Sequence, residues 1–107
     1  MKHVRLLYSD FVSANKDAFE QGLYTMAYHA LAGAMQCALH LQHKQLMAEL
    51  QQLVIEQKMQ IEAELQATAS LPEFTSGNIN EVAALANYRA LETIIGIRLV
   101  LLQTNSN

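Results

Sequence analysis

Four histidines and one cysteine are the side chains best suited to metal binding or nucleophilic chemistry in this sequence. His40 and His43 lie three residues apart, a spacing that can place two metal ligands on one face of a helix. A catalytic zinc site needs three protein ligands, and no cysteine or nearby carboxylate completes this pair. Cys37 has no basic neighbour and no second cysteine, which is typical of a small buried apolar residue. We therefore predict no metal site and no catalytic cysteine.

Motifs that mark enzymes are also missing from the sequence. No serine has the G-x-S-x-G context of a hydrolase nucleophile, and no glycine-rich loop is present to cradle a phosphate. No glutamate precedes a histidine by three residues, as in the carboxylate-bridged metal bundles. Glu62 and Glu64 are two residues apart on a predicted helix, so their carboxylates do not converge. The sequence predicts no catalytic residue, no cofactor and no enzymatic activity.

Charge and hydropathy limit the partners that we expect. The net charge is −3, whereas nucleic-acid-binding domains carry a basic patch. The longest apolar stretches, residues 26–39 and 94–102, are shorter than the roughly 18–20 residues that span a bilayer. The N-terminal segment has no apolar run of signal-peptide length. We expect a cytoplasmic protein that binds neither nucleic acid nor membranes.

Hydrophobic periodicity indicates helices along almost the whole chain, and the alternating pattern of strands is absent. A chain of 107 residues is expected to form one domain. We predict helices over residues 3–20, 24–41, 43–67 and 79–103, with one clear loop at 68–78. Asn78 and Glu81 match the N-cap and N3 positions of a capping box and so place the start of the last helix. The expected fold class is all-α, either a four-helix antiparallel bundle or a stack of two helical hairpins.

Small residues dominate the second predicted helix. Ala30, Ala34 and Ala38 recur every four residues and share one face. Such a face lets a neighbour approach toward the short end of the usual 8–10 Å axis separation, so we expect this helix to be the innermost. One continuous helix over 24–67 is the alternative, because no proline or glycine interrupts it. A turn at Gln42–His43 folds the apolar stripes onto each other and is our prediction.

The segment that follows the first turn resembles the centre of a tetratricopeptide repeat. It carries, in order, Gly22, Tyr24, Ala27, Leu31 and Ala34. This family places such residues at the turn and along its second helix. The resemblance covers residues 11–41, and a shift by the family's repeat of about 34 residues finds no second consensus repeat. It implies a tetratricopeptide-like helical hairpin whose crossing is formed by these five residues, and the binding of a peptide.

The end of the last predicted helix is apolar nearly all round. Charged residues make up only 16% of the chain against 51% hydrophobic residues, and glutamines replace much of the charge on the third helix. Four helices of this length have limited ability to cover residues 94–102 on every side, so a second chain is the expected cover. We predict a homodimer whose candidate interface comprises Ile94, Ile97, Arg98, Leu101 and Leu102.

The function that fits these expectations is that of a small non-enzymatic helical module for protein–protein interaction or assembly. Two alternatives stay open. One is a helical carrier that holds an apolar ligand in the bundle, and the other is a small helical domain associated with nucleic acid. No residue of the sequence identifies a particular protein partner.

Overall fold

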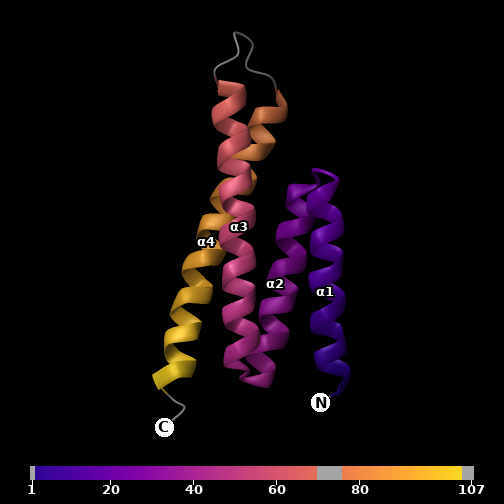
Figure 1. The fold of residues 1–107 in the computed structure, drawn as a ribbon, viewed down its shortest axis with the longest axis vertical. Coiled ribbons are helices and arrows are strands. Elements are labelled where there is room, and N and C mark those ends of the chain that lie inside the picture. The colour runs from indigo at the N-terminus through magenta and orange to yellow at the C-terminus, as the bar shows by residue number, and fades with distance from the viewer. Residues whose placement is uncertain (1, 70–75, 105–107) are drawn as a thin grey trace.

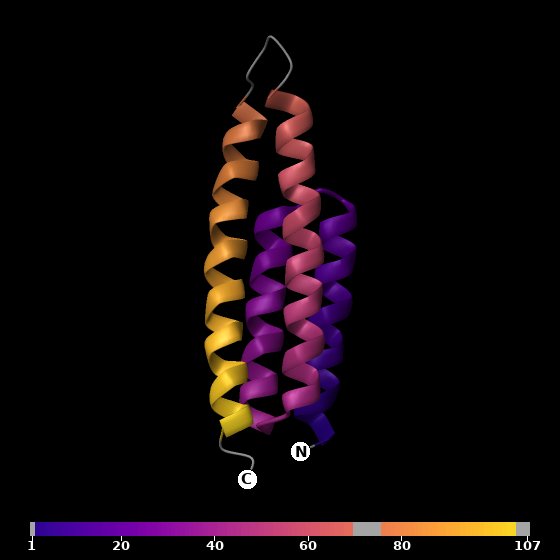
Figure 2. The same cartoon turned by 60° about the vertical axis from the view of Figure 1, so that its left-hand side comes forward.

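The chain folds into an all-α bundle of four helices (Figure 1). The structure is a computed structural model and describes residues 2–69 and 76–104. The helices are α1 (Lys2–Glu20), α2 (Tyr24–Leu41), α3 (Lys44–Ala69) and α4 (Ser76–Thr104). Consecutive helices run in opposite directions, so α1 begins and α4 ends at the same end of the bundle (Figures 1 and 2). The described ranges contain no strand.

A left-handed glycine closes the turn between α1 and α2. Gly22 has a φ of 78°, a conformation that glycine adopts at little steric cost. The amide of Leu23 donates to the carbonyl of Ala18 at 2.9 Å, and the amide of Gly22 donates to the carbonyl of Phe19 at 3.0 Å. These two bonds form a Schellman motif, which satisfies the last carbonyls of a helix. The chain can therefore reverse direction within three residues.

A second tight turn separates α2 from α3 at Gln42–His43. Gln42 is also left-handed, with a φ of 51°, and the amide of His43 donates to the carbonyl of Ala38 at 3.1 Å. The Nδ1 atom of His43 accepts a hydrogen bond from the amide of Leu46 at 3.2 Å and so caps the start of α3. The alternative of one continuous helix over 24–67 is therefore wrong.

The predicted loop at 68–78 is too long at both ends. α3 continues to Ala69, and α4 begins at Ser76 rather than at Ile79. Asn78 therefore lies inside α4, so the capping-box pattern gives the wrong helix start. Gly77 costs the helix only about 1 kcal/mol relative to alanine, an amount that packing between two helices readily offsets. Residues 70–75 of the predicted loop lie outside the described residues.

The helix α2 lies in the middle of the bundle and packs against each of the other three helices. The most extensive packing joins α1 to α2 and α3 to α4, so the bundle consists of two hairpins side by side (Figures 1 and 2). α1 lies on one flank of the bundle and α4 on the other (Figure 1). The prediction that the small-residue helix is innermost is confirmed. Its alanines leave room for three neighbours at once.

The two hairpins differ in length. α3 and α4 contain 26 and 29 residues, whereas α1 and α2 contain 19 and 18. The α3–α4 hairpin therefore projects beyond the turn between α1 and α2 at the top of Figure 1. The lower ends of all four helices lie nearly level.

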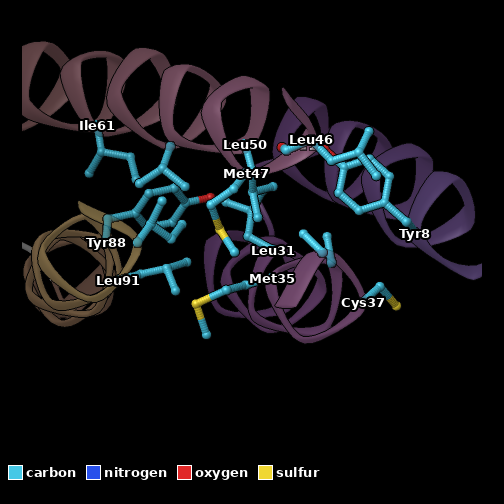
Figure 3. Close-up of a cluster of buried hydrophobic side chains, with 14 of the residues drawn as sticks. Tyr8, Leu31, Met35, Cys37, Leu46, Met47, Leu50, Ile61, Tyr88 and Leu91 are labelled. Carbon is cyan, nitrogen blue, oxygen red and sulfur yellow. Dashed lines mark hydrogen bonds between the residues drawn. The ribbon is translucent and has the colours of Figure 1, made fainter. Parts of the chain in front are cut away.

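Buried apolar side chains from all four helices form one core. In Figure 3, Tyr88 and Leu91 extend from α4 toward Leu31 and Met35 of α2, with Ile61 of α3 above them. Large buried side chains of the first half of α3 complete this core: Leu46, Met47, Leu50 and Val54. Only one face of the second half of α4 contacts this core.

The α1–α2 hairpin is packed closely at Gly33. The ring of Phe11 lies so near to this residue that an added Cβ would come within 2.7 Å of it. Real side chains do not approach to that distance, so the ring of Phe11 can occupy this place against α2 only because residue 33 has no side chain.

Candidate functional site

The helix α4 carries two apolar faces, and only one of them is covered by the bundle. The inner face is buried in the core at Leu85, Tyr88, Leu91 and Ile95. The outer face is 43–57% exposed at Ile94, Ile97, Val100 and Leu101. Soluble monomers seldom expose a contiguous group of large apolar side chains without a binding role. We therefore take this outer face as the candidate functional site.

A shallow apolar groove lies beside the outer face, between α3 and α4. It has a volume of about 470 Å³ and is lined by Gln51, Ile55, Glu92, Thr93, Gly96, Ile97, Val100 and Leu101. Gly96 contributes no side chain to the groove. The space there is sufficient for a Cβ atom, whose nearest neighbour would be Nε2 of Gln51 at 3.7 Å. The groove can therefore accept an apolar side chain from another molecule.

Ion pairs between α3 and α4 border this groove. The Nζ atom of Lys58 lies 2.7 Å from Oε1 of Glu92, with both side chains largely shielded from solvent. One turn earlier on α4, a guanidinium nitrogen of Arg89 lies 3.4 Å from Oε2 of Glu62, where both groups are more exposed. Because the carboxylate of Glu92 is paired within the chain, the groove favours an apolar occupant over a cationic one.

The structure places the five predicted interface residues differently. Ile94, Ile97 and Leu101 lie on the exposed outer face, and Arg98 is exposed beside it. Leu102 is half-buried and packs against the core, because it follows the buried positions of the inner face. Val100 was not among the predicted residues, although it is 56% exposed and lines the groove. The site thus consists of Ile94, Ile97, Val100 and Leu101, with Arg98 at its edge.

The five residues predicted for the helix crossing lie in the α1–α2 hairpin. Ala27, Leu31 and Ala34 are completely buried on α2. Gly22 forms the turn, and Tyr24 is half-buried at the start of α2. These residues hold the bundle together and lie away from the outer face of α4.

Tyr24 also connects α2 to the projecting hairpin. Its ring centroid lies 5.0 Å from that of Phe19, and its hydroxyl donates a hydrogen bond to Glu64 of α3. Burial raises the pKa of Tyr24, and the neighbouring carboxylates of Glu64 and Glu81 raise it further. The phenol therefore stays protonated and acts as a donor across the range in which proteins fold.

The residues with the greatest potential for chemistry do not converge. His40 is exposed, while His43 caps α3. Cys37 is buried, and this burial raises the pKa of its thiol, which disfavours the reactive thiolate. Among the described residues, no three histidine, cysteine, aspartate or glutamate side chains gather in a group that could hold a metal ion.

A buried polar cluster, which the sequence analysis did not identify, joins α1, α3 and α4. The side-chain amides of Asn15 and Gln57 form a reciprocal pair, with Nε2 of Gln57 donating to Oδ1 of Asn15 at 2.7 Å and Nδ2 of Asn15 donating to Oε1 of Gln57 at 3.0 Å. The hydroxyl of Tyr88 donates to the same Oε1 at 2.6 Å. Asn15 Nδ2 also donates to the Ala27 carbonyl at 2.9 Å, which extends the cluster to α2. All four helices therefore meet at this cluster.

The cluster is well shielded from water. Asn15 and Tyr88 are completely buried, and Gln57 is 5% exposed. Burial raises the pKa of Tyr88, so its hydroxyl remains a hydrogen-bond donor. A signal in the sequence existed for part of this cluster, because Gln57 interrupts the apolar stripe of α3 and Asn15 lies between Phe11 and Ala18 on the stripe of α1. Gln57 borders a surface hollow of about 310 Å³ between α1 and α3, whereas Asn15 and Tyr88 are completely buried, so we assign the cluster a structural role.

Comparisons with known proteins give no relative from which a function could be transferred. No protein-family model matches the chain, and neither the curated proteins nor the solved structures include a significant match. The resemblance to the tetratricopeptide repeat therefore stays a prediction. Within residues 2–69 and 76–104, no helix combines the length and hydropathy required to cross a bilayer.

Proposed function

We propose that this protein is a non-enzymatic helical assembly module that binds a second copy of itself through the outer face of α4. The observation that carries the proposal is the group of exposed apolar side chains beside the groove, Ile94, Ile97, Val100 and Leu101. Removing such side chains from water contributes roughly 25 cal/mol for each Å² that becomes buried. A contact along this face therefore has a driving force that a polar helix face lacks.

The chemistry of the face favours an apolar helix as the occupant. Charged partners are disfavoured, since the residues at the centre of the face have no charge and the carboxylate of Glu92 already pairs with Lys58. A second copy carries the same apolar face, and an isologous contact buries both faces at once. The groove beside Gly96 offers space for a side chain of the second molecule.

A substitution at the centre of the face tests this proposal. Ile97 is 57% exposed, so Ile97→Asp leaves the folded monomer almost unaffected but places a charge in the contact. We expect the wild-type protein to show twice the 11.9 kDa mass of one chain in light scattering. The twofold contact contains Ile97 of both copies, so the loss of two anchor residues at about 2 kcal/mol or more each weakens the dimer by roughly 1,000-fold. Ile97→Asp should therefore be monomeric at the same concentration.

The matched control is Leu6→Asp. Leu6 is 65% exposed and lies on α1, on the opposite flank of the bundle (Figure 1). This variant introduces the same charge and should keep the dimer mass. A wild-type chain that remains monomeric at tens of micromolar contradicts the proposal. A monomer that binds a small apolar probe in the groove, with the binding lost in Ile97→Asp, would instead support a ligand carrier.

A further inference from the structure

The exposed face of α4 follows a heptad spacing over almost the whole helix. Residues separated alternately by three and four positions lie on this face: Ala83, Ala86, Ala90, Thr93, Ile97, Val100 and Thr104. All seven are exposed and none is charged. Such a stripe is the seam along which a helix pairs with another helix in a coiled coil. We call these seven residues the outer stripe.

Side-chain size divides the outer stripe into two halves. The first half contains only alanine, at Ala83, Ala86 and Ala90, whereas the second half contains the bulky residues Ile97 and Val100. A parallel, in-register pair would place bulky residues against bulky residues and alanine against alanine. Such a contact requires the helix axes to lie closer together at the alanine end than at the bulky end, because the axis separation depends on the side chains at the contact. Close-packed interfaces instead place large residues against small ones.

We infer that two copies pair through α4 in an antiparallel arrangement whose twofold axis lies between Leu91 and Glu92. This register places Ala83 opposite Val100 of the second copy, Ala86 opposite its Ile97, and Ala90 opposite its Thr93. Ile97 and Val100 then each face an alanine, and the central layers pair Ala90 with Thr93. The inference rests on the proposed self-association and specifies its direction and register.

The charges near the outer stripe are compatible with this register. Arg89 flanks the stripe on the same side as Gly96, and the antiparallel pairing places it beside Gly96 of the second copy. Gly96 carries neither a side chain nor a charge, so Arg89 can remain paired with Glu62 of its own chain. Arg98 lies off the stripe and does not oppose Arg89. In this register no charged residue of α4 falls opposite another charged residue of the second α4.

Cross-linking between two different single-site variants tests the register. Ala83→Cys and Val100→Cys are made as separate full-length proteins, mixed in equal amounts and treated with a short bismaleimide. Facing positions bring the two thiols together, so the mixture should give a covalent dimer that contains one chain of each variant. Each variant alone should give little product, because its two thiols are about 26 Å apart along the helix axis at 1.5 Å per residue.

Two controls keep the result interpretable. The wild-type protein retains Cys37, which is 6% exposed and should not cross-link. Light scattering on each variant shows whether it is dimeric before the reagent is added. Efficient cross-linking of either variant alone would establish a parallel pair and overturn the inference while leaving self-association intact. A dimer with no cross-link in the mixture would overturn the register, whereas a monomer would overturn the proposed function itself.

Discussion

The buried polar cluster and the outer stripe of α4 have opposite relations to water. Asn15 and Gln57 are amides enclosed by apolar side chains, while Ile97 and Val100 are aliphatic residues left exposed at 57% and 56%. In a typical domain the amides would lie outside and the aliphatic residues inside. The contrast separates two tasks: buried polar groups fix the orientation of the helices, and the exposed aliphatic residues are available for the self-association that we propose.

The polar cluster restricts how the helices can be arranged. Apolar contacts tolerate small shifts of one helix along another, but hydrogen bonds between 2.6 and 3.0 Å do not. A slip of one turn between the two hairpins would separate Asn15 from Gln57 and leave both amides buried without partners. The cluster therefore favours one register between the α1–α2 hairpin and the α3–α4 hairpin.

The largest expected effect comes from breaking the polar cluster. Asn15→Ala removes the acceptor of Gln57 Nε2 and leaves a cavity beside it. A stranded buried donor costs about 1–3 kcal/mol, and the cavity adds to this. We expect the free energy of unfolding, measured by urea titration, to fall by about 3 kcal/mol. A loss below about 1 kcal/mol would show that water enters the site and that the cluster is not sealed.

The double variant Asn15→Leu with Gln57→Leu sharpens the same comparison. Each variant strands one buried donor, Gln57 Nε2 in Asn15→Ala and the Tyr88 hydroxyl in the double variant. The leucines leave no cavity, so the double variant should be more stable than Asn15→Ala. If the cluster provides orientation, the double variant should still lose near-ultraviolet circular dichroism or gain chemical-shift heterogeneity, because the helices can pack in more than one register. A uniquely packed double variant would argue against that role.

A smaller effect is expected from one substitution made at two glycines. In Gly33→Ala the new Cβ meets the ring of Phe11 at 2.7 Å, and overpacking of this kind costs about 1–3 kcal/mol. The gain of about 1 kcal/mol that alanine brings to a helix interior reduces this to a net loss of up to about 2 kcal/mol. In Gly96→Ala the nearest atom is 3.7 Å away, and alanine in a helix is favoured over glycine by about 1 kcal/mol. Thermal melts of dilute protein should therefore shift in opposite directions. Equal shifts in melting temperature would mean that the surroundings of Gly33 and of Gly96 are packed equally tightly.

The smallest expected effect concerns the phenol of the polar cluster. Burial raises the pKa of Tyr88 above its ordinary value of 10.0. Below pH 10 the phenol is protonated in both folded and unfolded chains, so it adds no pH dependence. Above pH 10 the unfolded chain releases the proton while the folded chain retains it, and the stability falls as pH rises.

The matched variant for this effect is Tyr88→Phe. It loses one hydrogen bond, at a cost of about 1 kcal/mol near neutral pH, and should show a shallower decline in urea unfolding between pH 9 and 11. The remaining slope comes from Tyr8, Tyr24 and Cys37, whose pKa values burial also raises. An unchanged slope in the variant would indicate that Tyr88 is accessible to solvent.

The all-α fold was predictable because the periodic spacing of apolar residues extends through every helix. The predicted bounds of α2 agree with the structure to the residue. Gly22 limits the start of this helix, and the turn that folds the apolar stripes of α2 and α3 onto each other limits its end. The left-handed conformation of Gln42 was not predictable from its residue type, because glycine or asparagine usually occupies this position. Its conformation is set by the packing of α2 against α3.

The candidate site was predictable in part. The apolar residues of α4 form two stripes, one through Tyr88 and Ile95 and one through Ile97. Periodicity alone does not show which stripe faces the core, because both are long and uncharged. In the structure, the stripe that contains Tyr88 and Ile95 is buried in the core, and the stripe that contains Ile97 is exposed. The polar cluster could not be predicted from local sequence patterns, because Asn15 and Gln57 are 42 residues apart in the chain. The sequence of one helix shows that a polar residue interrupts its apolar stripe, but it does not show which residue of another helix will bond to that residue.

The unequal lengths of the two hairpins have a consequence for the way the molecule opens. Between Ile61 and Ala84, which are both completely buried, none of the described side chains at 62–67 and 80–83 is buried. Amide protons in these turns of α3 and α4 can exchange with solvent through local opening that leaves the core intact. Opening free energies therefore rise along the long axis, from residues 62–67 and 80–83 toward the cluster where the four helices meet.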